Sequence, residues 1–71
     1  MFALKLIRVI LGIGQGQLAA RAGVSVRELA RIENAEVMPR APAAKALDAA
    51  LIGILRERAR EAAERELKET P

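Results

Sequence analysis

The strongest constraint on the fold is a helix stop followed at once by a helix start, in the first half of the chain. Gly23 comes directly after the segment GQLAARA, where a glycine in the left-handed conformation typically ends a helix. Ser25 is a preferred N-cap residue, and Glu28 three positions later completes the Ser-x-x-Glu pattern of a capping box. The sequence therefore predicts two short helices, over residues 16–22 and 26–34, joined by a tight turn.

A further helix is expected on each side of this pair. The opening segment MFALKLIRVILGI predicts a core helix that ends near Gly12, although alternating apolar residues at its start also fit a strand. Lys5 and Arg8 interrupt the segment and it is too short to span a bilayer, so we expect neither a signal peptide nor a membrane helix. After the breaker AEVMPRAP, a fourth helix is expected to begin near Ala43, with Pro42 at or just before its first turn.

Each predicted helix has an apolar face that would contribute to a common core. These faces consist of Leu4, Ile7 and Leu11 in the first helix, Leu18, Ala19 and Ala22 in the second, Leu29 and Ile32 in the third, and Leu47, Ala50 and Leu51 in the fourth. The sequence has no strand-type run flanked by turns and no internal repeat. The predicted fold class is therefore all-α, with four to five helices.

The last part of the chain differs in kind. Residues 54–71 combine strong helix formers with opposite charges four residues apart, such as Arg60 and Glu64. The apolar stripe that leads into this part is thin and runs through Ile52, Leu55, Ala59 and Ala62. Two interpretations remain open: a solvated terminal helix that frays, or a helical arm for dimerisation or for docking of a protein partner. We therefore divide the chain into a domain of residues 1–53 and a charged C-terminal arm of residues 54–71.

The composition argues against an enzyme. The chain has no cysteine and no histidine, so it lacks the thiolate, the usual general base and the usual ligands of transition metals. Its side-chain hydroxyls are those of Ser25 and Thr70, which leaves few candidates for a nucleophile. We expect no catalytic residue, no metal and no cofactor. The absence of cysteine suits the reducing cytoplasm, where we expect the protein to act.

The charge of the chain is divided unevenly. Residues 1–50 carry seven basic and four acidic side chains, whereas residues 51–71 carry five of each sign. The whole net charge of +3 thus lies in the first part, and most of its basic residues are arginines. Localised arginine is typical of a protein that binds a polyanion. Readers of RNA and of single strands stack bases on aromatic side chains, and this chain has only Phe2, so duplex DNA is the polyanion that remains.

An ordered set of short motifs resembles the Cro/CI-type (XRE-family) DNA-binding domain of phage repressors and small bacterial regulators. The matching residues are Gln15-Gly16-Gln17-Leu18-Ala19, then Gly23-Val24-Ser25, then Ile32-Glu33-Asn34, and finally Pro39. The match extends without a gap from about Ile7 to Leu51. The resemblance implies a small lambda-repressor-like helix-turn-helix domain whose second short helix enters the major groove of DNA. A helical bundle that happens to carry such caps is the alternative interpretation.

Residues at the start of that recognition helix would face the base edges. The residues expected to read bases are Val26, Arg27, Glu28 and Arg31. An arginine can donate two hydrogen bonds to guanine O6 and N7, and a valine can pack on a thymine methyl group. The glutamate is ambivalent, since its carboxylate can accept from cytosine N4 or can complete the capping box, which we favour. A solvated charged face is the plain alternative for the two arginines, but Leu29 and Ile32 on the opposite face count against it.

The resemblance also assigns roles outside this helix. Residues expected to contact phosphates or to position the domain are Gln15, Gln17, Asn34 and Arg40. Arg8 and Glu33 match a basic–acidic pair that joins the first helix to the end of the third, and with the Ser25 cap they are expected to be structural. Two departures from the family pattern are visible. Gly14 stands where a serine or threonine cap is usual, and the loop of residues 35–38 is acidic and apolar where many relatives are basic.

Together these features predict a sequence-specific, repressor-like transcriptional regulator. It would bind a pseudo-palindromic duplex operator as a homodimer, with its two recognition helices about 34 Å apart. Exposed Ile52, Ile54 and Leu55 are expected to supply much of the dimer contact, because an alanine-rich core of this size is marginal alone. The alternative is the antitoxin of a toxin–antitoxin pair, in which residues 54–71 become ordered on the toxin. A purely structural helical module would show no salt-dependent binding of DNA.

Overall fold

The central helix pair forms where the cap signals predict it. The computed structural model describes the backbone of residues 2–69 and the side chains of residues 4–69. In it, α2 (Gln15–Ala22) and α3 (Val26–Glu33) are joined by a short turn. Gly23 ends α2 in the left-handed region, with φ at 73°. The N–H of Gly23 donates to the Ala20 carbonyl and the N–H of Val24 to the Ala19 carbonyl, both in the last turn of α2. A residue with a Cβ would be strained at this φ, so glycine at position 23 stabilises the turn.

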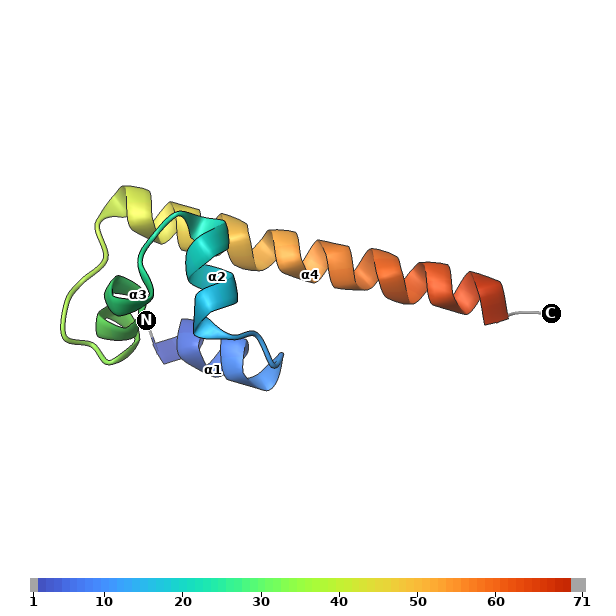
Figure 1. Ribbon diagram of the computed structural model, residues 1–71, viewed down its shortest axis with the longest axis horizontal. Helices are drawn as coiled ribbons and strands as arrows, with labels where there is room; N and C mark the ends of the chain where they lie inside the picture. Colours follow the sequence, from blue (N-terminus) through green and yellow to red (C-terminus); the bar gives the residue numbers. More distant parts are fainter. Residues whose placement is uncertain (1, 70–71) are drawn as a thin grey trace.

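Two further helices complete the fold. α1 (Phe2–Ile10) precedes the central pair, and α4 (Ala41–Glu69) follows it. Figure 1 shows α1, α2 and α3 gathered beside the first half of α4, while the second half of α4 projects away on its own. The molecule is accordingly long and narrow, with extents of 51 × 20 × 17 Å. Residues 2–69 contain no strand, and the all-α fold class is confirmed.

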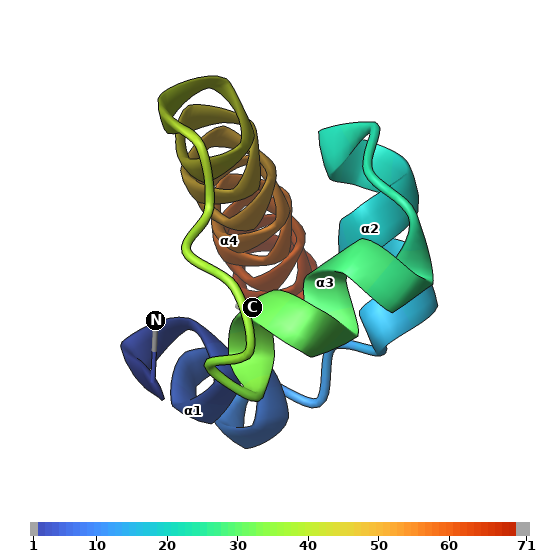
Figure 2. The same ribbon diagram turned by 90° about the vertical axis from the view of Figure 1, so that its left-hand side faces the viewer.

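The core lies where α2 packs against α4 and α3, and where α3 packs against α1 (Figure 2). Its buried residues are Leu4, Ile13, Leu18, Ala19, Leu29, Ile32, Leu47, Ala50, Leu51 and Ile54. Most of the predicted inner faces are thereby confirmed. Ile7, which we expected on the inner face of α1, is instead 39% exposed, because Leu4 and Arg8 point inward and leave Ile7 at the edge. The sequence reading also missed Ile13, which the turn at Gly12 (φ 68°) carries into the core.

α4 runs without a break through the position where we divided the chain. Ile54, which we expected to be exposed, is 2% exposed, since it lies four residues after Ala50 on the same face of the helix. Its prediction as a dimer contact is therefore wrong: Ile54 belongs to the core of its own chain. α4 begins at Ala41, two residues earlier than predicted, with Pro42 inside its first turn.

Two arginines fasten the middle of α4 to the rest of the fold. Arg21, in the last turn of α2, donates from Nη1 to Glu57 Oε2 at 2.8 Å and from Nη2 to Glu57 Oε1 at 2.6 Å. Arg58 donates from Nη1 to the backbone carbonyl of Leu11. The first part of the predicted arm is thus held by the globular part of the chain as far as residue 58.

Candidate nucleic-acid interface

The start of α3 is built by the Ser25 cap. Ser25 has extended backbone angles (φ −76°, ψ 153°), and its Oγ accepts a hydrogen bond from the backbone N–H of Glu28 at 3.0 Å. This bond satisfies one of the N–H groups that the first turn of a helix leaves unpaired. The cap places Val26, Arg27 and Glu28 in the first turn of α3, and all three are exposed.

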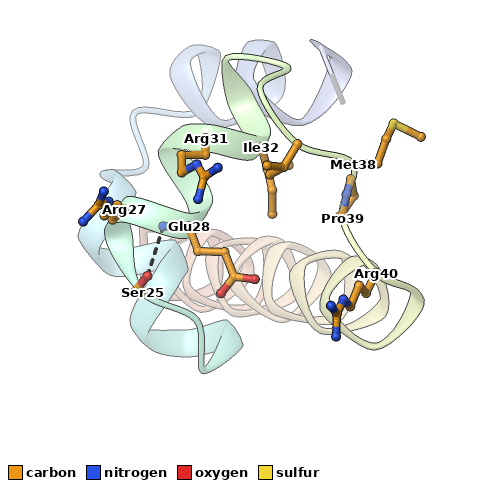
Figure 3. Close-up of a pocket in the computed structure, with 9 residues that line it drawn as sticks. Ser25, Arg27, Glu28, Arg31, Ile32, Met38, Pro39 and Arg40 are labelled. Carbon is orange, nitrogen blue, oxygen red and sulfur yellow. Dashed lines mark hydrogen bonds between the residues drawn. The ribbon is translucent and has the colours of Figure 1, made fainter.

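The capping box is only half formed. Within the described part of the chain, the Glu28 carboxylate has no hydrogen bond to the backbone N–H of Ser25, which would be the second half of the box. Our preference for the carboxylate as a cap was therefore wrong: the backbone N–H of Glu28 serves the cap and its side chain does not. Figure 3 shows the carboxylate extending from α3 toward the space between this helix and the start of α4.

A groove of about 450 Å³ runs beside α3 and is bounded on its other side by the loop that leads into α4. Its lining consists of Ser25, Arg27, Glu28, Arg31, Ile32, Val37, Met38, Pro39 and Arg40. Figure 3 shows the guanidinium groups of Arg27 and Arg31 on α3 and that of Arg40 across the groove. Three cations and one carboxylate therefore surround a mostly apolar floor. Such a groove favours an anionic, partly apolar ligand such as a nucleic-acid strand.

Arg31 is held only loosely. Its Nε lies 3.8 Å from an Oε of Glu36, and both side chains are more than half exposed. An ion pair of this length in water contributes little to stability, so the guanidinium can leave it for a stronger acceptor. The loop after α3 thus supplies a weak resting partner for Arg31 and leaves its donors available to a ligand.

The Arg8–Glu33 pair is present and lies behind α3. Arg8 donates from Nε to Glu33 Oε2 at 2.7 Å and from Nη2 to Oε1 at 3.0 Å, and the Glu33 side chain is 1% exposed. Gln15 Nε2 adds a third bond to Oε1 at 2.9 Å, and Arg8 Nη1 donates to the Ile13 carbonyl at 2.9 Å. Burial alone would raise the pKa of Glu33, but the bonds from Arg8 and Gln15 outweigh it and the pKa lies below its ordinary value. Glu33 is therefore charged at neutral pH, and its bonds to Arg8 and Gln15 join α1, α2 and α3.

The remaining predicted contact residues do not line the groove. Gln17 is exposed in the first turn of α2, and Asn34 is the exposed C-cap of α3. Gln15 is half buried because of its bond to Glu33, and Gly14 before it offers no side-chain cap, as expected. The groove thus brings together Arg27, Glu28, Arg31 and Arg40, but not Val26 or the polar residues of α2.

Three lining residues were missed from the sequence: Val37, Met38 and Pro39. Met38 is 90% exposed and stands in the acidic and apolar loop that departs from the family pattern. The sequence feature that could have indicated Met38 is its place directly before Pro39, in a segment that lies between the predicted helices. The loop reaches this position after Ala35, which adopts a positive φ of 59° and turns the chain back along α3.

The family of the chain follows from comparison with known proteins. The profile of the helix-turn-helix family matches residues 4–52, which is more than half of the chain. The chain belongs to the Cro/CI-type helix-turn-helix family. In this domain, α2 and α3 form the helix-turn-helix, and the fold is lambda-repressor-like. Searches of curated proteins and of solved structures found no significant match.

The helix-turn-helix family is a family of DNA-binding regulatory domains. Among the described residues, no helix is long and apolar enough to cross a membrane. The same part of the chain holds no cluster of three or more histidine, cysteine, aspartate or glutamate side chains that could bind a metal ion.

Proposed function

We propose that the protein is a sequence-specific transcriptional regulator, repressor-like and homodimeric, that acts in the cytoplasm on a pseudo-palindromic duplex site and has no enzymatic activity. The groove beside α3 carries this proposal, because its arginines come from both walls, next to a helix start that is capped and exposed. A duplex backbone is the polyanion that fits three guanidinium groups on one surface.

Base reading is proposed for the first turns of α3. Arg27 and Arg31 lie four residues apart on an exposed face, while Leu29 and Ile32 are buried on the other. Each arginine can bind one guanine with two hydrogen bonds. Val26, which is 47% exposed, can pack on a thymine methyl group.

Base reading is proposed for Glu28 as well, which is one of the two roles expected for its carboxylate. Its backbone serves the cap, so its carboxylate is available to accept a hydrogen bond from cytosine N4. A carboxylate at the surface also repels phosphates, which keeps the first turn over the bases and away from the sugar–phosphate strand. Positioning on the backbone is proposed for Gln15, Gln17, Asn34 and Arg40.

The regulator is favoured over an antitoxin. An antitoxin reading expects residues 54–71 to become ordered on a toxin, whereas α4 is already helical through Glu69. The charged surface at α3 supports DNA binding without any second protein.

Selection of bound sequences from a random duplex pool tests the proposal. We expect a consensus with two inverted half-sites that contain guanines for Arg27 and Arg31. Binding to the selected duplex should weaken with salt, with a slope of about −5 in log K against log salt for five or six phosphate contacts per dimer. A pool without any consensus, or an affinity that salt does not change, would contradict the function and favour a structural module.

A further inference from the structure

α1 exposes a cluster of apolar side chains on the side that faces away from the core. Inward, it contributes Leu4 and the structural Arg8. Outward, it exposes a cluster of large aliphatic side chains: Leu6 (61% exposed), Ile7 (39%), Val9 (57%) and Ile10 (72%). A contiguous group of exposed apolar side chains, unlike single exposed ones, marks an interaction surface. The structure therefore leaves α1 with one side uncovered.

This outer α1 face, formed by Leu6, Val9 and Ile10, differs from the exposed apolar residues of α4. Ile52, Leu55 and Leu67 are also exposed, but charged residues separate the last two. On α1 the exposed aliphatic residues fall within positions 6–10, and Lys5 beside them is the one exposed charge of residues 4–10. The outer α1 face thus brings large aliphatic side chains closer together than the exposed apolar residues of α4 are.

We infer that a second copy of this chain covers the outer α1 face, with α1 packed against α1 across a two-fold axis. The inference rests on the proposed function, for which it names the dimer surface. An isologous contact places the same patch on both sides, so aliphatic side chains meet aliphatic side chains. Lys5 then lies at the rim, where charged residues of interfaces are usually found, and no like charges face each other at the centre.

The position of α1 in the fold suits such a dimer. Figure 2 looks at the end of the molecule where α3 lies, and α1 is at the edge of that view, beside α3 and not in front of it. If the two-fold axis runs along the viewing direction of Figure 2 and passes beside α1, both copies of α3 lie at the same end of the dimer. Two recognition helices can then face one duplex, as a pseudo-palindromic site requires.

The size of the contact determines its strength. α1 has nine residues and is about 14 Å long, so a pair of these helices buries an area at the small end of specific interfaces. Dimers of this size are weak, and we expect dissociation at micromolar concentrations or above. A duplex with two half-sites holds two copies of the chain next to each other. This raises the effective concentration of one α1 face near the other and so favours the dimer on DNA.

Sedimentation equilibrium of the full chain, at concentrations from about 1 to 200 μM, tests the inference. The variant is Ile10→Lys, which places like charges across the two-fold axis. A cation is favoured in the last turn of a helix, so α1 should remain folded. The matched control is Leu67→Lys, at a similarly exposed position in the last turns of α4. Leu6→Gln is a second variant of the same face that adds no charge.

We expect the wild-type chain and Leu67→Lys to form dimers alike. Ile10→Lys should weaken dimerisation by at least about 100-fold, since like charges across an interface cost several kcal/mol, and Leu6→Gln should weaken it less. Circular dichroism should be unchanged in all of them. A wild-type chain that is monomeric throughout, or a loss of dimer in Leu67→Lys but not in Ile10→Lys, would overturn the inference.

Binding to two duplexes separates this inference from the proposed function. One duplex carries a single half-site and the other carries both. Ile10→Lys should bind the single half-site as Leu67→Lys does, but should lose the gain in affinity that the second half-site gives. If the wild-type chain binds neither duplex, the proposed function fails. If Ile10→Lys retains the gain from the second half-site, DNA binding stands and the α1 dimer is wrong.

Discussion

The side-chain amide of Gln15 lies 2.9 Å from Oε1 of Glu33, the oxygen that also accepts from Arg8 Nη2. Gln15 is the first residue of α2 and Glu33 the last of α3, so one hydrogen bond joins the two ends of the helix-turn-helix. A residue expected to bind a phosphate is thus fixed in place by a buried ion pair. The second N–H of the same amide can still donate to a phosphate oxygen.

Gln15→Ala should weaken binding to every duplex by a similar amount, about 1 kcal/mol, because contacts to phosphates position a protein without reading sequence. Titration of the selected duplex and of a scrambled one measures both affinities. Gln17→Ala, at an exposed position in the same turn, provides a comparison without the Glu33 bond. A loss restricted to the selected duplex would show that Gln15 reads a base.

Arg8→Met should destabilise the fold by about 3–5 kcal/mol, because it leaves the carboxylate of Glu33 buried and unpaired. The double variant Arg8→Met with Glu33→Leu should recover much of this loss, since it removes both charges. Urea unfolding followed by circular dichroism gives the free energies. If the single variant lost less than about 1 kcal/mol, a value typical of exposed pairs, Glu33 would have to be solvated in the folded chain.

The stability of the chain should fall in acid through Glu33. Its pKa is lowered in the folded state, so its contribution is fully present above the unfolded value of about 4.3 and is lost as the pH falls through the lower folded value. Urea midpoints between pH 7 and pH 3 measure the change. Glu33→Gln should show a flatter profile than the wild type, whereas Glu61→Gln, on the exposed part of α4, should keep the wild-type profile. Equal profiles for both variants would exclude Glu33 as the cause.

Arg27→Ala and Arg31→Ala should each lose about 1–3 kcal/mol on the selected duplex and relax its consensus at one position. Their affinity for scrambled DNA should change much less. Arg60→Ala removes the same charge from the exposed part of α4 and serves as the control. A variant of Arg27 that folds and keeps full specificity would mean that α3 approaches the groove by a different face.

Gly53→Ala should stabilise the chain by up to about 1 kcal/mol, because glycine inside a helix is unfavourable relative to alanine. Gly53 lies where Arg21 crosses α4 to reach Glu57, and an added Cβ would come within 3.0 Å of Arg21 Nη2. That atom is at the end of a flexible, exposed side chain, so it can move aside. A thermal melt compares the two chains. A lower midpoint for Gly53→Ala would show that the Arg21–Glu57 contact stabilises α4 more than helix propensity does.

The sequence by itself determined the helix-turn-helix. Gly23 and Ser25 act within four residues of their own positions, since a left-handed cap and an N-cap each bond to the adjacent turn. The faces of α2 and α3 followed from the spacing of Leu18, Leu29 and Ile32, because a helix places residues three or four apart on one side. The Arg8–Glu33 pair was accessible only through the family resemblance.

Only the tertiary structure decided what the remaining residues do. Whether Ile54 is exposed depends on how far α4 continues along α2, and this in turn depends on contacts such as Arg21–Glu57, 36 residues apart. The Glu28 carboxylate and Met38 face the groove because the loop after α3 turns at Ala35. The burial of Ile54 and the orientation of Glu28 and Met38 depend on long-range packing. The hydrophobic periodicity of the sequence carries no information about that packing. For the same reason, only the tertiary structure shows which face of α1 is uncovered, because it shows that Leu4 and Arg8 point into the fold while Leu6, Val9 and Ile10 do not.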